Sequence, residues 1–295
     1  MFKRQTSGPV SCPSCRQLVD VKASSCSRCG RKNPGMWGYA RTLQRLGADL
    51  GFIEIVTWGC LTLYVLTLLA DINGVTAWSG GGLGTSILSP SSRATFLFGS
   101  TGAVPIFLFG RWWTVLTAPW LHGDLFHIGF NIAIFRYFAP TVARVYGAGR
   151  LAIIYTIAGI SGCLLTSVVG AYFQDLPEPL QGANFSVGAS GAIFGLLGAL
   201  ISYSQQEKDP GMRQAVSSYA LVIFLLGFLF ARTDNWGHFG GFLGGYLATK
   251  LPYLNSRDRE GQGQIFVAIA CLLATLLGVI ASVAHVLLSS AFFGL

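Results

Sequence analysis

Long apolar stretches recur along the chain and alternate with short polar connectors. A helix needs about 20 consecutive apolar residues to cross a bilayer core. The pattern predicts seven such spans, near residues 51–70, 122–141, 149–172, 189–204, 214–231, 237–254 and 265–290. The long connector at 71–121 is rich in Gly, Ser, Trp and Phe, so we expect a loop lying partly in the membrane interface, where Trp is favoured. These features predict an all-α polytopic membrane protein.

The composition supports a bilayer environment. Of the 295 residues, 52% are hydrophobic and only 11% are charged, whereas soluble domains carry roughly 25% charged residues. The net charge is +8, and a basic balance can indicate nucleic-acid binding. Here, however, the basic residues flank apolar segments and form no long cluster. We therefore expect contact with the lipid bilayer and no nucleic-acid partner.

The positive residues also predict an orientation. Lys and Arg accumulate on the cytoplasmic side of membrane proteins. If the N-terminus is cytoplasmic, all of the 20 Lys and Arg fall on that side except Arg93, Arg111 and Arg232. We therefore expect a cytoplasmic N-terminus and a C-terminus outside. The first 50 residues are polar and basic, without the apolar core of a cleavable signal peptide.

Residues 1–35 are predicted to form a separate cytoplasmic head. Two CxxC turns are separated by ten residues, and they supply the candidate metal ligands Cys12, Cys15, Cys26 and Cys29. Four thiolates suit a tetrahedral structural zinc ion; two disulfides or free thiols are the alternatives. The head resembles the small zinc ribbons at the ends of many prokaryotic proteins, which favours a prokaryotic inner (plasma) membrane and a protein partner for the ribbon. Residues 36–50 are predicted to form a basic linker.

Polar side chains gather at one end of three predicted spans. Span two opens with His122, followed by His127 and Asn131, which share one helix face because they are four residues apart. Spans four and six open with Ser190 and His238. All three spans begin on the outer side, and polar groups inside a membrane mark function by default. Each residue also has an ordinary interpretation, because Ser is a favoured helix cap and His often bonds neighbouring helices.

The combination favours catalysis, because a serine nucleophile needs a neighbouring base and His is the usual one. A Ser–His hydrogen bond between helices requires a close approach, which small residues allow. Such residues follow both candidates: Gly191, Gly195 and Gly198 after the serine, and Gly241 and Gly245 after the histidine. No acidic residue stands near His238 within the predicted spans, and Asp234 is the closest in sequence, so a dyad is favoured over a triad.

Three motifs together resemble the rhomboid intramembrane serine proteases. They are Gly188-Ala189-Ser190-Gly191, the run from His122 through His127 to Asn131, and Gly237-His238-Phe239-Gly240-Gly241. The resemblance covers about residues 50–254 and implies a six-helix bundle at 51–254, with 255–295 adding a connector and a seventh helix. It implies Ser190 as nucleophile and His238 as general base. It further implies an oxyanion site at His127, Asn131 and the Ser190 N–H, with supporting residues His122, Gly188, Gly191, Phe194 and Gly241.

Two positions depart from the family pattern. Thr114 follows Trp113 where an arginine is common, and Phe194 stands where some members carry tyrosine. The sequence thus predicts a serine endopeptidase that cleaves single-span membrane proteins near the outer face, with no cofactor in catalysis and a structural zinc in the head. The alternative is a catalytically silent rhomboid-like protein that binds and routes membrane partners. A transporter is a weaker third hypothesis, because no inverted repeat is visible.

Overall fold

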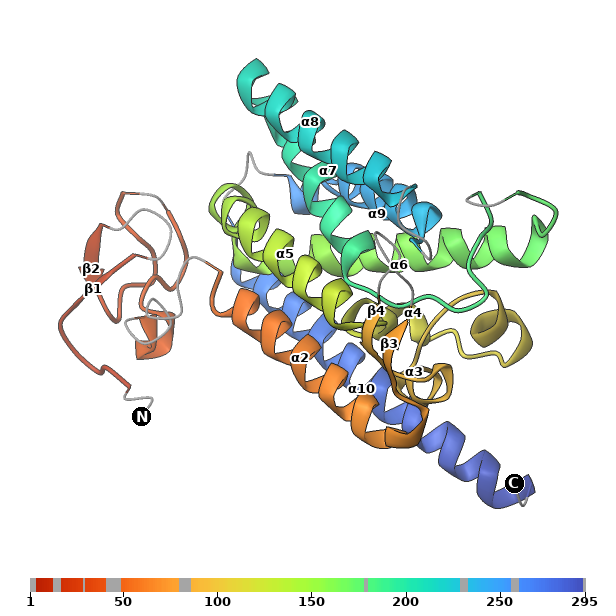
Figure 1. Ribbon diagram of the computed structural model, residues 1–295. Helices are drawn as coiled ribbons and strands as arrows, with labels where there is room; N and C mark the ends of the chain where they lie inside the picture. Colours follow the sequence, from red (N-terminus) through yellow and green to blue (C-terminus); the bar gives the residue numbers. More distant parts are fainter. Residues whose placement is uncertain are drawn as a thin grey trace.

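The computed structural model describes residues 4–12, 17–28, 30–40, 49–79, 86–177, 180–228, 233–255 and 260–293. A helix occupies each of the seven segments predicted as spans (Figure 1). These helices are α2 (Phe52–Ala70), α5 (Leu125–Tyr146), α6 (Ala148–Tyr172), α7 (Ser190–Gln206), α8 (Pro210–Gly227), α9 (Asn235–Ala248) and α10 (Gln262–Phe293). They form one bundle beside a small N-terminal unit.

Three of the described helices, α2, α6 and α10, are long and apolar enough to cross a membrane. The other four are shorter or more polar. Helix α9 has only 14 residues, so it extends about 21 Å along its axis, which is less than the thickness of a bilayer core. Helix α5 carries Arg136 and Arg144 as well as Pro140. Length and composition therefore support the seven-helix prediction in part.

Span two begins later than the sequence pattern indicated. The prediction that His122 opens this helix was wrong, because α5 begins at Leu125. Asp124 is the N-cap, and its side chain accepts a hydrogen bond from the His127 N–H at 2.8 Å. An aspartate in this position ends the preceding loop and starts the helix. His122 therefore lies in the loop before α5.

The connector at 71–121 is folded rather than a plain loop. Its elements are η2 (Ile72–Gly74), β3 (Thr76–Ser79), β4 (Ser86–Ser89), α3 (Ser92–Phe98), η4 (Val104–Leu108), α4 (Thr114–Thr117) and η5 (Ala118–Trp120). Its side chains divide between two environments. Phe107, Leu108, Phe109 and Trp112 are exposed, as expected for residues at a membrane interface, whereas Arg111 is completely buried.

Helices α6, α7 and α9 form the centre of the bundle, where α7 packs most extensively on α9 and α6. Glycines make this packing possible. A Cβ atom on Gly191 would lie 3.0 Å from the Gly237 oxygen, and one on Gly162 would lie 2.5 Å from the same atom. A Cβ on Gly195 would lie 2.8 Å from the Gly241 oxygen. The predicted close approach of the serine and histidine helices is therefore confirmed.

The N-terminal head contains an antiparallel pair of strands, β1 (Pro9–Ser11) and β2 (Leu18–Asp20), followed by the short helix η1 (Met36–Gly38). Its small core includes the buried side chains of Cys12 and Cys26. The other two predicted zinc ligands, Cys15 and Cys29, lie outside the described residues, as does most of the predicted linker. The head packs on Ile265 of α10.

Candidate active site

The N-terminal ends of α5, α7 and α9 meet at one end of the bundle, and α7 begins differently from the other two. Asp124 caps α5, and Asp234 caps α9 by accepting a hydrogen bond from the Gly237 N–H at 2.8 Å. Helix α7 has Ala189 at its N-cap position, with no side-chain cap. Ser190 is the first helical residue, so the interpretation of this serine as an ordinary helix cap does not hold.

Ser190 and His238 belong to facing helices. Ser190 and Phe194 lie one turn apart on the same face of α7, and the His238 ring stacks on the Phe194 ring with centroids 4.4 Å apart. His238 is buried, and its Nδ1 has no hydrogen-bond partner within the described part of the chain. The described residues contain no direct hydrogen bond between Ser190 and His238. Such bonds are often long in unliganded enzymes and shorten when substrate binds.

His127 presents a hydrogen-bond donor to the same point. Its Nδ1 accepts a hydrogen bond from the Gly123 N–H at 3.3 Å, which favours the tautomer that carries its proton on Nε2. A Cβ atom on Gly188 would lie 2.7 Å from the His127 Nε2 and 3.7 Å from the Ser190 Oγ. The imidazole N–H and the serine hydroxyl therefore flank one small space, which only a glycine at 188 leaves open.

Asn131 and His122 surround His127. The Asn131 side chain is 5% exposed, and its Nδ2 donates a hydrogen bond to the His127 oxygen at 2.9 Å. An amide nitrogen carries two hydrogens, so a second donor remains. The His122 ring is fully buried and lies edge-on to the His127 ring, with centroids 5.1 Å apart. The His122 ring thus packs against the His127 ring, whereas Asn131 bonds the backbone of His127.

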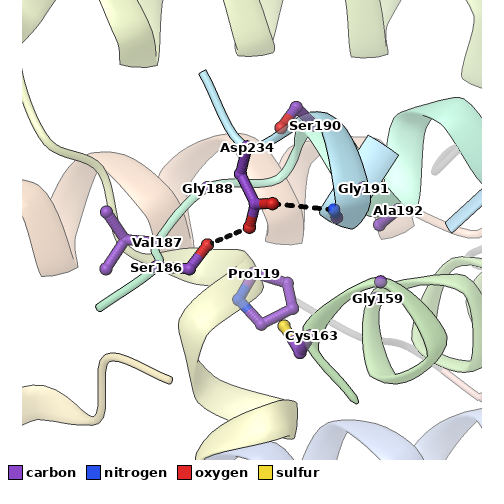
Figure 2. Close-up of a pocket in the computed structure, with 12 residues that line it drawn as sticks. Pro119, Gly159, Cys163, Ser186, Val187, Gly188, Ser190, Gly191, Ala192 and Asp234 are labelled. Atoms are coloured by element: carbon purple, nitrogen blue, oxygen red, sulfur yellow. Dashed lines mark hydrogen bonds between the residues drawn. The ribbon is translucent and has the colours of Figure 1, made fainter. Parts of the chain in front are cut away.

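A cavity of about 20 Å³ lies beneath Ser190 and is bounded by Ser186, Gly188, Asp234 and residues of α6 (Figure 2). This is room for one water molecule. The Asp234 carboxylate accepts a hydrogen bond from the Ser186 hydroxyl at 2.6 Å on one oxygen and from the Gly237 N–H on the other. It thereby joins the segment before Ser190 to the helix that carries His238.

The comparisons with known proteins converge on one family. Residues 109–254 match the model of the Rhomboid domain. The chain is 38% identical to the rhomboid protease GluP of Bacillus subtilis (strain 168) over 56% of this chain and 31% of that protein. It is 32% identical to the putative rhomboid protease YdcA of the same organism over 48% of this chain and 68% of that protein.

The chain belongs to the rhomboid family. Together with the apolar helices, this makes it a membrane protein. The similar proteins also include the inactive RHOMBOID-like protein 8 of Arabidopsis thaliana, at 31% identity over 44% of this chain and 35% of that protein. The chain spans less than half of the length of GluP and of RHOMBOID-like protein 5 of Arabidopsis thaliana.

The rhomboid connector before α5 has its arginine in an unexpected place. Thr114 occupies the position expected for arginine, and its hydroxyl donates a hydrogen bond to the Arg111 oxygen at 2.7 Å. Arg111, three residues earlier, is the buried cation. It donates hydrogen bonds to the oxygens of Phe96 at 2.7 Å and of Ser282 at 3.2 Å. Sequence reasoning missed Ser282, because no motif connects α10 with this connector.

The described part of the head fits the predicted metal site. The Cys12 N–H donates to the Gln17 oxygen at 2.8 Å, and the Cys26 N–H donates to the Arg31 oxygen at 2.9 Å. Each cysteine is thus hydrogen-bonded through its backbone to the residue five positions later, and both side chains are buried in one small core. Cysteines from two CxxC motifs that share one core fit a common ion.

Proposed function

We propose that the protein is an intramembrane serine endopeptidase whose nucleophile is Ser190 and whose general base is His238. The observation that carries the proposal is the stacking of the His238 ring on Phe194, one turn after Ser190, at an α7 end that has no side-chain cap. The uncapped end leaves backbone N–H groups free to bind a developing negative charge. The protease relatives support the same chemistry.

In this mechanism the His238 imidazole removes the hydroxyl proton as the Ser190 Oγ attacks the scissile carbonyl carbon. The carbonyl oxygen becomes an oxyanion, which accepts hydrogen bonds from the Ser190 N–H, the His127 Nε2–H and the Asn131 amide. Each such donor contributes about 3–4 kcal/mol to transition-state stabilisation. His238 then gives its proton to the leaving amine, and a water molecule hydrolyses the acyl-enzyme. The pair acts as a dyad, because the Asp234 carboxylate bonds Ser186 and Gly237 rather than the His238 ring.

The proposed substrates are single-span membrane proteins. A helix in lipid satisfies its backbone hydrogen bonds internally, so cleavage requires a helix end that unwinds readily. We propose cleavage near the outer face, with a cytoplasmic head, because almost all Lys and Arg lie on the head side of the predicted spans.

The test uses the full chain in lipid vesicles. A fluorophosphonate probe should label the wild type, and a model single-span substrate should be cleaved. Ser190→Ala should remove both signals, with cleavage falling by at least about a thousandfold, because the covalent step is lost. His238→Ala should lower labelling strongly. Equal labelling of wild type and both variants would reject the dyad and favour a non-catalytic binding role.

We also propose that the head binds a structural zinc ion through Cys12, Cys15, Cys26 and Cys29. Bound metal would supply folding energy to a unit too small to build a large core. Metal analysis of the purified full chain should give about one zinc per chain, and Cys26→Ser should reduce this content. A strong chelator should unfold the head, measured as proteolysis between residues 1 and 50, while labelling of Ser190 persists. Retention of the head's protease resistance after complete zinc removal would contradict this proposal.

A further inference from the structure

The outer half of α10 contacts the connector before α5 along one narrow face. Gly278 and Ser282 are both buried and lie four residues apart, so they share this face. The Ser282 hydroxyl accepts a hydrogen bond from the Trp113 indole N–H at 2.9 Å, and the Ser282 oxygen accepts one from Arg111 at 3.2 Å. In Figure 1, α10 runs beside this part of the bundle.

Glycines make the contact tight. A Cβ atom on Gly278 would lie 3.0 Å from the Thr117 Cγ2. A Cβ atom on Gly99 would lie 2.6 Å from the Ser282 Oγ, and Gly99 has a φ of 104°, which L side chains rarely adopt. The Thr117 hydroxyl donates a hydrogen bond to the Gly99 oxygen at 2.6 Å. Helix α10 therefore meets residues 99 and 113–117 of the connector without space to spare.

Arg111 makes this contact costly to lose. Its guanidinium lies 4.1 Å from the centre of the Phe96 ring and is completely buried. Among the described residues no carboxylate pairs with it, and its acceptors are two backbone oxygens. A buried cation that loses an acceptor pays a large desolvation penalty. The oxygen of Ser282 is one of the two acceptors, so α10 and the connector are held in a single arrangement.

The connector in turn holds residues 186–188, just before Ser190, at two points. The Gly188 N–H donates a hydrogen bond to the Ala118 oxygen at 3.0 Å, one residue beyond Thr117. Thr101 and Ser186 pair through two backbone hydrogen bonds, at 2.7 and 3.0 Å. Both attachments lie within four residues of the nucleophile. A shift of the connector would therefore be passed directly to the serine.

We propose that the Gly278–Ser282 face of α10 is a positioning element of the active site, acting through residues 99–101 and 113–118 on the 186–188 segment. The inference rests on the proposed protease function. It assigns the seventh helix a role in the geometry of the reaction, although the helix contributes no group that touches substrate. A misplacement of about 1 Å costs up to a hundredfold in rate, so a small movement of α10 changes turnover.

The decisive variants enlarge Gly278. Gly278→Leu should lower the kcat for substrate cleavage and the rate of fluorophosphonate labelling by about a hundredfold, while KM changes little, because the attack geometry rather than substrate binding is disturbed. Gly278→Ala should lower kcat by about fivefold. Alanine favours helices over glycine, so a lower rate without lower helix stability separates positioning from folding. The matched control is Ala281→Leu, an enlargement on the exposed side of the same helix.

A second substitution tests the contact itself. Thr117→Ser removes the methyl group that a side chain introduced at position 278 would meet. It keeps the hydroxyl that bonds the Gly99 oxygen. Adding it to Gly278→Ala should recover most of the lost rate, because neighbouring substitutions that relieve one clash are not additive. Comparing Gly278→Ala with and without Thr117→Ser tests the positioning role even if Gly278→Leu does not fold.

The outcomes separate the two proposals. If the wild type is not labelled at Ser190, the protease function fails. If the wild type is labelled, three results each overturn the positioning role: Gly278→Leu labels at the wild-type rate, Ala281→Leu loses as much activity as Gly278→Leu, or Thr117→Ser gives no recovery.

Discussion

Helices α5 and α9 begin with an aspartate that closes the helix end, whereas α7 begins without one. Asp124 accepts the His127 N–H, and Asp234 accepts the Gly237 N–H. Ala189 offers no side-chain acceptor at the start of α7. A cap of this kind stabilises a helix by about 1 kcal/mol. The two capped helices carry the groups that must be oriented, His127 and His238.

The uncapped start makes α7 locally less stable than a capped helix, at the point where the proposed reaction takes place. An uncapped helix start leaves N–H donors and the positive end of the helix dipole unsatisfied. In the proposed mechanism, the oxyanion of the reacting substrate uses these donors. A capping side chain at 189 would occupy them permanently. The aspartates at the other two helices instead fix the histidine backbones, which need rigidity and no free donors.

The largest expected effect comes from placing a capping carboxylate on α7. Ala189→Asp should lower cleavage and fluorophosphonate labelling about a hundredfold relative to Ala189→Asn, because the negative charge occupies the donors and repels the oxyanion. The two side chains have nearly the same size, so their ratio isolates the charge from the crowding at this buried position. Wild-type rates in both variants would break the distinction between the helix starts.

Removing the cap of α9 should have a smaller effect. Asp234→Ala loses the hydrogen bonds to the Gly237 N–H and to Ser186, so we expect about a tenfold fall in kcat as His238 and the serine segment drift apart. Asp234→Asn keeps an oxygen that can accept the Gly237 N–H and should retain most of the activity. Steady-state kinetics on both variants measure the fall in kcat. Similar losses of kcat in both would show that the hydrogen bond to the Gly237 N–H does not control turnover.

The cap of α5 should matter least for turnover and most clearly for stability. Asp124→Ala should lower the free energy of unfolding by about 1 kcal/mol, measured by denaturant titration in mixed micelles. Activity should fall only a few-fold, because the Gly123 N–H still orients the His127 ring. Asp124→Ser, which keeps a capping oxygen, should unfold close to the wild type. A loss of activity larger than that of Asp234→Ala would reverse the expected order.

Much of the fold was predictable from periodicity alone. Seven helices lie in the seven predicted segments, because an apolar run long enough for a bilayer leaves few alternatives. The glycines after Ser190 and His238 predicted the close packing of α7 on α9, which the structure confirms. The start of α5 was misjudged by three residues, since apolar periodicity extends past a capping aspartate. The folded connector at 71–121 was also missed, because its short elements are held by tertiary contacts.

The sequence by itself determined which residue types stand at the candidate site and which end of the bundle they share, since helix direction and spacing follow from chain order. The tertiary structure alone decided that the Asp234 carboxylate bonds the Ser186 hydroxyl, 48 positions away in the chain. It alone decided that Arg111 reaches α10, a contact between residues 171 positions apart. Such pairings depend on how helices pack in space, and no local pattern of hydrophobic and polar residues encodes a contact between residues so far apart in the chain.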